Sequence, residues 1–247
     1  MNLLLLRPDE ISDDGTALLR GRRAVHAREV LKAHAGDTLV TGVLGGRIGT
    51  GTVISSSGDA LAVRVSLDRD APPRSPVDLL LALPRPKVLR RVLQAAASMG
   101  IGRIALVGSW RVEKSYWGSP ALEPDAIREE LALGLEQGRD TVPPDVLVRK
   151  LFKPFVEDEL DAAFPSTHRL LAHVTATSRL DSVAPPTARV VLAIGPEGGW
   201  TPYEARRLVE LGFQDFSLGP RALRVDAAVA YAVGQVEHWL RTRLTRA

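Results

Sequence analysis

The chain has 247 residues, of which 45% are hydrophobic and 25% charged, a composition typical of a folded globular protein rather than a disordered one. It contains no cysteine, which excludes disulfides, thiolate nucleophiles and cysteine-ligated metal sites and fits a reducing compartment. The net charge of +3 permits nucleic-acid binding without requiring it. No apolar run approaches the ~20 residues of a membrane span, and the leucines near the N-terminus are too few for a secretory signal, so we expect a soluble cytoplasmic protein without a membrane partner.

Residues 1–72 have the pattern of a small β-rich domain. Between residues 37 and 67 apolar and polar side chains alternate, with breaks at 45–46 and 57–59, which predicts short antiparallel strands joined by turns. The glycine-rich stretch at the first break lacks the order of a dinucleotide-binding motif, so it favours a β-turn. Residues 24–37 have helical spacing, and the Gly-Asp pair at their end predicts the end of that helix.

Three prolines within residues 71–76 predict a linker, after which strands and helices alternate from residue 76 to 247. This alternation indicates an α/β domain with a parallel sheet. The predicted strands cover residues 77–84, 103–108, 145–149, 168–173, 189–195 and 215–218. The predicted helices cover residues 86–100, 123–139, 155–164, 201–212 and 225–243, and Thr201 with Glu204 forms a capping-box pattern at the start of the fourth.

Two loops rich in glycine and proline follow predicted strands, at residues 195–200 and 217–228. Ligands of open parallel sheets bind beyond the carboxyl ends of the strands. Glycine lets the backbone approach a ligand closely and proline fixes the turn, so such loops can hold a flat heterocycle, although two purely structural turns are the alternative. The phosphate-binding G-x-x-x-x-G-K-[ST] pattern is absent, and Glu197 would repel a triphosphate, so a neutral or cationic ligand is favoured.

The stretches "IGPEGGWTPYE" (residues 194–204) and "SLGPRALR" (residues 217–224) resemble the two cofactor loops of SPOUT-superfamily methyltransferases. Most of the chain, including "HAREVLKAHAGD" and "EQGR", resembles the bacterial 16S ribosomal RNA uridine N3-methyltransferases. The resemblance implies an RNA-binding, PUA-like β-barrel at residues 1–72 and a SPOUT α/β methyltransferase domain with a deep trefoil knot at residues 76–247. It implies S-adenosylmethionine as methyl donor, and a homodimer in which each cofactor site is completed by the other subunit.

The function implied is methylation of N3 of a uridine in 16S rRNA, within the 30S ribosomal subunit, without a metal. The resemblance assigns these residues to the cofactor: Leu83, Ile194, Gly195, Pro196, Glu197, Gly198, Gly199, Trp200, Leu218, Gly219, Arg221 and Leu223. Two rival interpretations remain, a ribose 2′-O-methyltransferase and a non-catalytic RNA-binding or assembly protein on the same fold. The second is favoured only by Val225-Asp226-Ala227, which stands where the family has Thr-Glu-Thr.

Attack by uracil N3 builds negative charge on the carbonyl oxygens of the base, which a guanidinium group can stabilise. Arg221 and Arg224 are the candidates for this role, and Asp226 is a candidate proton acceptor, with Glu197 and water as alternatives. The five histidines are scattered and show no metal-ligand spacing.

Because N3 lies on the Watson–Crick edge, the target base must be unpaired or pulled from its stack. Basic residues on the predicted helix at 86–100 and near the N-terminus are candidates for phosphate contacts: Arg7, Arg22, Arg23, Lys87, Arg90 and Arg91. The stretch "WRVEKSYW", residues 110–117, offers aromatic side chains for which packing and base stacking are both open.

Overall fold

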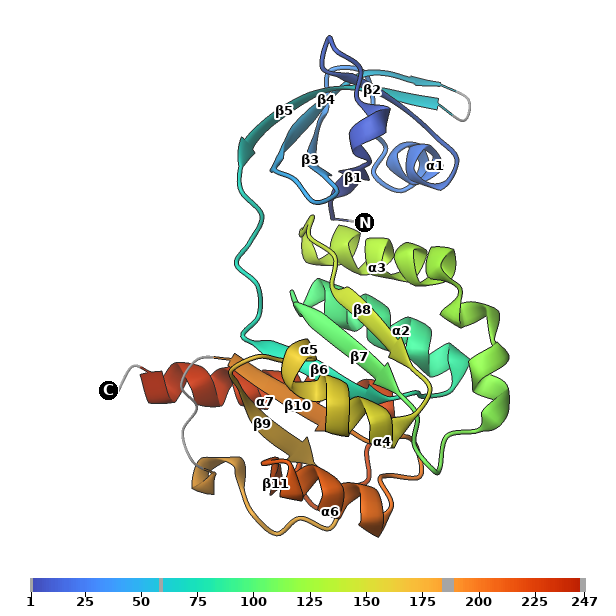
Figure 1. Cartoon of the computed structure of the whole chain (residues 1–247). Coiled ribbons are helices and arrows are strands. Elements are labelled where there is room, and N and C mark those ends of the chain that lie inside the picture. Colours follow the sequence, from blue (N-terminus) through green and yellow to red (C-terminus); the bar gives the residue numbers. More distant parts are fainter. Residues whose placement is uncertain (1, 58–59, 184–188, 245–247) are drawn as a thin grey trace. The chain divides into compact units, whose positions relative to one another are not determined.

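The computed structural model describes residues 2–57, 60–183 and 189–244 (Figure 1). It divides into two compact units, one made of Met1–Pro73, Ala97–Gly100 and Leu131–Pro143, the other of Arg74–Ala96, Ile101–Glu130 and Pro144–Ala247. The predicted linker at residues 71–76 contains no helix or strand, and the boundary after Pro73 falls within it. None of the described helices is long and apolar enough to cross a membrane.

The first unit is built on a five-stranded mixed sheet in the order β1-β3-β4-β5-β2, curled into a half-barrel. Its elements are β1 (Leu4–Leu6), a 3-10 turn (Pro8–Glu10), β2 (Thr16–Arg20), α1 (Arg22–Glu29), β3 (Thr38–Val43), β4 (Ile48–Ser57) and β5 (Ala60–Arg69). The antiparallel pairs β3–β4 and β4–β5 confirm the strands predicted from the alternating pattern. The parallel pairing of β1 with β3 was not predicted.

The helix predicted over residues 24–37 is wrong at both ends, because α1 runs only from Arg22 to Glu29. Lys32 takes a left-handed backbone conformation (φ 54°), which a continuing helix cannot contain. The apolar residues after Glu29 therefore belong to a loop, in which the N–H of Ala33 bonds to the carbonyl of Ala27 at 3.0 Å.

The second unit contains a six-stranded parallel sheet in the order β11-β9-β10-β6-β7-β8, which confirms the predicted α/β class. Its strands are β6 (Val77–Ala82), β7 (Arg103–Val107), β8 (Asp145–Arg149), β9 (Thr167–Ala172), β10 (Arg189–Ile194) and β11 (Gln214–Phe216). The main helices are α2 (Pro86–Ser98), α3 (Pro124–Gly138, which is shared between the two units), α6 (Pro202–Glu210) and α7 (Val225–Leu244).

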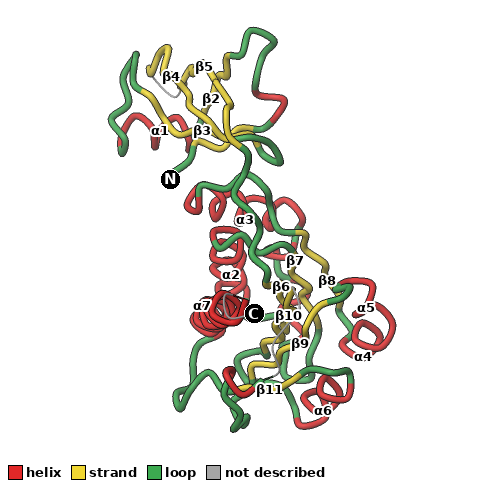
Figure 2. The backbone as a smooth tube through the Cα atoms, turned by 90° about the vertical axis from the view of Figure 1, so that its left-hand side faces the viewer, coloured by secondary structure: helices red, strands yellow, loops and turns green. Residues whose placement is uncertain are grey.

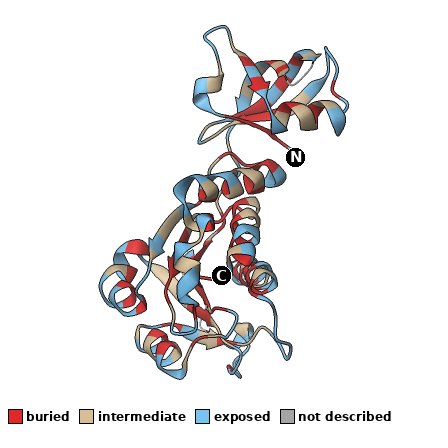
Figure 3. Cartoon of the chain, turned by 90° about the vertical axis from the view of Figure 1, so that its right-hand side faces the viewer, coloured by how far each residue is buried: buried red, intermediate tan, exposed pale blue. Residues whose placement is uncertain are grey.

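The second sheet is covered on both faces. Helices α2 and α7 lie on one face, and α6 lies on the other with the helical segment after β8 (Figure 2). Buried residues concentrate in the strands and on the inner sides of these helices, and all six residues of β6 are buried (Figure 3). Continuous apolar strands of this kind are typical of parallel sheets buried on both faces.

The helix predicted over residues 155–164 begins three residues earlier. It is a continuous segment of α4 (Phe152–Pro154), a π-helical turn (Phe155–Glu159) and α5 (Leu160–Ala163). Pro154 is compatible with this start because the first-turn N–H groups of a helix have no intrahelical partner. The side chains of Phe152, Phe155 and Leu160 are buried, so the segment is held by its packing.

Asp78 is a buried carboxylate at the start of the central strand β6, with 5% of its surface exposed. Its Oδ1 accepts a hydrogen bond from the backbone N–H of Arg103 at 2.8 Å, and its Oδ2 accepts one from Nη2 of Arg189 at 2.7 Å. Arg103 begins β7 and Arg189 begins β10, the two neighbours of β6. One side chain therefore fixes the starts of three adjacent strands.

We expect Asp78→Ala to lower the free energy of unfolding by about 2 kcal/mol or more, because charge-assisted hydrogen bonds are lost and a buried N–H is left unpaired. The control is Asp145→Ala, which removes an exposed partner of the Arg103 side chain (Nε–Oδ2 3.0 Å) and leaves the backbone bond to Asp78 in place, and it should cost less than about 1 kcal/mol. Urea denaturation followed by circular dichroism measures both. Equal losses would contradict the role of Asp78.

Candidate functional site

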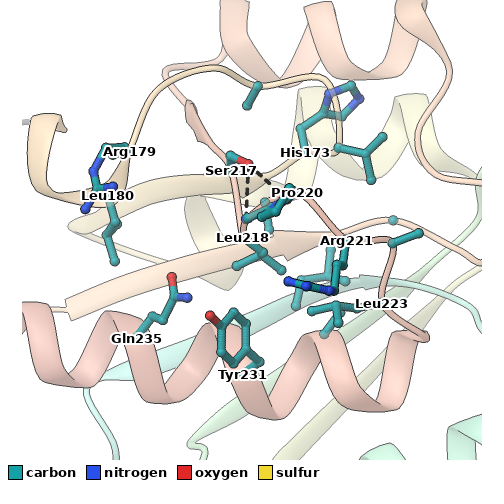
Figure 4. A pocket seen from close by; sticks show the side chains of 18 of the residues that line it. His173, Arg179, Leu180, Ser217, Leu218, Pro220, Arg221, Leu223, Tyr231 and Gln235 are labelled. Carbon is teal, nitrogen blue, oxygen red and sulfur yellow. Dashed lines mark hydrogen bonds between the residues drawn. The ribbon is translucent and has the colours of Figure 1, made fainter.

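Three neighbouring strands of the second unit end side by side. Ala172, the last residue of β9, is paired with Ile194, the last of β10, and with Phe216, the last of β11. Since the strands are parallel, the loops that follow them leave from one edge of the sheet. Together with α7 they enclose an open pocket of about 1320 Å³ (Figure 4). The two loops predicted to form a site therefore share a pocket with a third.

Ten of the twelve residues predicted to bind the cofactor line this pocket: Ile194, Gly195, Pro196, Glu197, Gly199, Trp200, Leu218, Gly219, Arg221 and Leu223. Leu83 and Gly198 do not. Leu83 is buried directly after β6, and its N–H bonds to the carbonyl of Val107 at the end of β7 at 2.8 Å. The carbonyl of Gly198 instead accepts a hydrogen bond from the guanidinium group of Arg111.

The loop after β10 makes a tight turn that requires glycine at two positions, Gly195 and Gly199. The N–H of Gly199 bonds to the carbonyl of Pro196 at 2.7 Å, and Gly199 has a φ of +71°. A Cβ on Gly195 would lie 2.9 Å from the backbone nitrogen of Trp200, closer than folded proteins tolerate. The turn presents Glu197 at the pocket, where Oε1 accepts a hydrogen bond from the backbone N–H of Arg85 at 3.0 Å.

Two buried tryptophans contribute to the pocket wall. Trp200 is 3% exposed and packs against Phe152 with ring centroids 5.5 Å apart, and Trp239 of α7 is 5% exposed. The indole N–H groups of both lack a hydrogen-bond partner among the described residues. Buried donors without partners are rare in folded proteins and commonly mark a place where a ligand or water binds.

Sequence reasoning missed two parts of the pocket. The loop after β9 carries His173, Arg179 and Leu180, and the rule that ligands bind beyond strand ends would have found it if applied to this strand as well. Helix α7 contributes four side chains that are three or four residues apart and therefore share one helix face: Tyr231, Gln235, His238 and Thr242. Figure 4 shows Tyr231 and Gln235 beside the loops.

Of the three predicted catalytic residues, only Arg221 lines the pocket. Its side chain makes no hydrogen bond or ion pair with the described part of the chain, so its charge is available to a ligand. Arg224 and Asp226 lie outside the pocket lining and interact with each other (Nε–Oδ1 3.6 Å). Arg91 of α2 also contacts Asp226, with Nη1 2.9 Å from Oδ2, so two guanidinium groups compensate this carboxylate.

Most of the predicted RNA-binding arginines are already paired. Arg90 lies 3.6 Å from Glu130, and Arg91 is held by Asp226. Within the first unit Arg22 forms a bidentate ion pair with Glu136, and Arg23 forms another with Glu10. Arg7 and Lys87 are exposed and form no ion pair with the described residues. The basic residues predicted to contact phosphates from α2 are therefore largely neutralised by acids.

Glu204 connects the loop after β7 to the loop after β10. The predicted capping box is confirmed, since Thr201 Oγ1 accepts from the N–H of Glu204 while the Glu204 carboxylate accepts from the N–H of Thr201 at 2.8 Å. The same carboxylate, 4% exposed, also accepts hydrogen bonds from the backbone N–H of Trp110 at 2.8 Å and from the hydroxyl of Ser109 at 3.1 Å. One buried side chain thus fixes two of the loops at this edge of the sheet.

We expect Glu204→Ala to lower the free energy of unfolding by about 3 kcal/mol, since several donors lose a buried charged acceptor at once. Glu210→Ala on the same helix removes an exposed carboxylate that pairs with Arg207, and should change stability little. Amide hydrogen exchange at Trp110 and Thr201 should accelerate in Glu204→Ala alone. Unchanged exchange at both amides would contradict the role of Glu204.

His173 lines the pocket with a half-buried imidazole whose Nδ1 lies 2.8 Å from the hydroxyl of Thr175. Burial lowers the pKa of this imidazole from its usual value of 6.5, and the negative charge of Asp215 opposes the shift. The folded protein therefore holds His173 neutral at pH values where the unfolded chain begins to take up a proton.

It follows that the free energy of unfolding should fall as the pH drops below 6.5, because the unfolded state then binds more protons than the folded state. His173→Gln should reduce this loss between pH 6.5 and 5 and leave stability at pH 8 nearly unchanged. Urea denaturation at a series of pH values measures both slopes, and identical slopes would show that His173 makes no contribution.

Residues 71–237 match the model of the RNA methyltransferase domain, and the chain belongs to that family. Its relatives include proteins named ribosomal RNA small subunit methyltransferase E. The one from Treponema pallidum is 31% identical over 96% of this chain and 90% of its own length, and the one from Mycobacterium bovis is 29% identical over 96% and 92%. The predicted relationship to the SPOUT methyltransferases of this type is confirmed.

Solved structures share the fold. A ribosomal RNA small subunit methyltransferase E from Neisseria gonorrhoeae, bound to S-adenosyl methionine, superposes with a TM-score of 0.75 at 21% identity and covers 96% of this chain and 97% of its own. A putative methyltransferase from Legionella pneumophila, in complex with the same cofactor, has a TM-score of 0.74 at 21% identity and the same coverage. Both structures therefore carry the ligand that the family resemblance implies.

Proposed function

We propose that this chain transfers a methyl group from S-adenosylmethionine to N3 of a uridine in 16S rRNA, within the small ribosomal subunit in the cytoplasm. The observation that carries the proposal is the single pocket that gathers both predicted cofactor loops at the ends of β10 and β11. The names of the relatives that match the chain over nearly its whole length support rRNA as the substrate.

The pocket fits this cofactor chemically. Glu197 is held at the pocket by the N–H of Arg85, and a carboxylate there favours a ligand with a positive charge, as a sulfonium is. The turn at Pro196–Gly199 brings backbone groups to the surface of the pocket, where a heterocycle can bond to them.

S-adenosylmethionine would supply a methyl group on sulfur, and the bond from this carbon to uracil N3 forms as its bond to sulfur breaks. Arg221 is the residue we assign to the developing negative charge on the uracil carbonyl oxygens, because its guanidinium group reaches the pocket without a competing partner among the described residues. The imide proton passes to water or to Glu197. Arg224 and Asp226 then position the start of α7 and do not touch the base.

We further propose that the chain acts as a homodimer and that its C-terminal segment forms a deep trefoil knot, as the family resemblance implies. Leu223 and Tyr231 line the pocket with 40% and 51% of their surface exposed. Large apolar side chains left exposed at a binding site commonly contact a further surface, which supports completion of the pocket by a second subunit.

The test combines cofactor binding with product analysis. Isothermal titration should find one S-adenosylmethionine site per chain, abolished by Gly195→Val because the new side chain would collide with the backbone at Trp200. Methylation of unmodified small subunits should then yield N3-methyluridine, identified by mass spectrometry of the nucleosides. A ribose-methylated product would replace the proposal by the 2′-O-methyltransferase alternative, and the absence of any cofactor binding or methylated product would favour the non-catalytic RNA-binding protein.

Arg221→Ala should bind S-adenosylmethionine close to normally and lose about 100-fold in methylation rate, the usual effect of removing one stabilising donor. Arg224→Ala, a control of the same residue type in the same loop, should retain most of the rate. If the two variants lose activity equally, Arg221 has no special role in the chemistry.

A further inference from the structure

Trp110 is the most exposed large hydrophobic residue in the described part of the chain, with 88% of its surface accessible. It follows strand β7 at the carboxyl edge of the parallel sheet. Tryptophan is highly buried on average, so an almost fully exposed indole is unfavourable unless something covers it. The ring of Trp110 therefore contributes little to packing within the described part of the chain, and it is available to contact a ligand or partner.

The backbone beneath the ring is rigid. The N–H of Trp110 donates to the buried carboxylate of Glu204, and the preceding Ser109 donates to the same group. Gly108 lies so close to the next loop that a Cβ on it would be 2.1 Å from the carbonyl oxygen of Lys150. The backbone that carries the indole is therefore held in place, which lowers the entropic cost of binding a ligand there.

The loops around Trp110 contact one another and the cofactor loop. Arg111 donates to the carbonyl of Gly198, and the N–H of Arg85, after β6, donates to Glu197. The N–H of Gly108 bonds to the carbonyl of Arg149 at the end of β8 at 3.0 Å. These contacts make one continuous surface from the ends of β6, β7 and β8 to the cofactor loop.

This surface is basic. Residues 83–85, 108–118 and 150–154 contain five basic side chains and one acid, Glu113. The basic residues are Arg85, Arg111, Lys114, Lys150 and Lys153, and each is exposed and forms no ion pair with the described residues. The arginines of α2 at positions 90 and 91, in contrast, are held by acids. The loops after β6, β7 and β8 therefore carry five basic side chains without an ion pair among the described residues.

We propose that Trp110 is a stacking platform for an unpaired RNA base, and that Arg85, Arg111, Lys114, Lys150 and Lys153 bind the phosphates of the same strand. We call these six residues the strand-end surface. The inference rests on the proposed function and names where its RNA substrate lies. β7 is two strands from β10 at about 4.8 Å per strand, so the loop of Trp110 and the cofactor loop leave the same edge of the sheet about 10 Å apart, which lets one RNA strand reach both. Base stacking on aromatic side chains with phosphate contacts from cations is the common mode of single-strand RNA binding.

The test uses the full chain and a fluorescein-labelled ten-nucleotide oligouridylate, with binding followed by anisotropy at several salt concentrations. Trp110→Ala should weaken binding about tenfold or more, while Trp110→Phe retains most of the affinity, because stacking needs only an aromatic face. The double variant Lys150→Ala/Lys153→Ala should lower the slope of log K against log salt by about 1.4, as expected for two lost phosphate contacts. Arg241→Ala, near the C-terminal end of α7, removes one positive charge away from the strand-end surface and should leave the slope unchanged.

Titration with S-adenosylmethionine separates this inference from the proposed function. Trp110→Ala should bind the cofactor as the wild type does, since Trp110 does not line the pocket. If the wild type binds cofactor and methylates rRNA but Trp110→Ala binds oligouridylate normally, the proposal that Trp110 stacks on an RNA base is wrong and the proposed function stands. If Trp110→Ala also changes the oligomeric state in sedimentation, the ring packs against a second copy of the chain, which equally overturns the stacking role.

Discussion

The parallel, level pairing of β9, β10 and β11 is the constraint on which the site depends. Ala172 faces both Ile194 and Phe216 across the ladder, so the chain leaves all three strands at the same height. A shift of one residue in either register would turn the side chains of that strand to the opposite face and move its loop out of line. The position of the pocket is therefore set by strand pairing, and the loop sequences determine which side chains line it.

Charged groups in the second unit fall into two kinds. Asp78 and Glu204 are buried and fully engaged with donors, and they fix strand starts and strand-end loops respectively. Several cations without acidic partners among the described residues lie at the carboxyl edge of the sheet, on the strand-end surface and at Arg221. Removing a partner from a buried carboxylate is costly, whereas a solvated cation is free to meet an anionic ligand. Buried carboxylates thus support the fold, and cations without acidic partners among the described residues remain available to a ligand.

The sequence was sufficient for the class of fold and for most of the pocket. Strands with continuous apolar runs, such as β6 and β10, can be assigned from sequence alone, and the glycine–proline pattern of the loops identifies the residues around Trp200 as part of a binding site. What it could not supply is pairing between distant segments. Glu130 and Asp226 lie far along the chain from the arginines of α2. The basic residues of that helix therefore resembled a binding face, although both arginines have acidic partners. The early end of α1 depends on the conformation of Lys32, which apolar spacing does not reveal.

The hydrogen bond from Trp110 to Glu204 comes from the backbone of Trp110 and not from its ring. Any residue other than proline can donate that bond, so folding places almost no restriction on which side chain stands at position 110. Across related chains the path of this loop should be inherited with Glu204, while the side chain at 110 is free to drift unless something outside the fold selects it. The residue found at this position in related proteins therefore indicates whether a binding partner has selected for an aromatic side chain there.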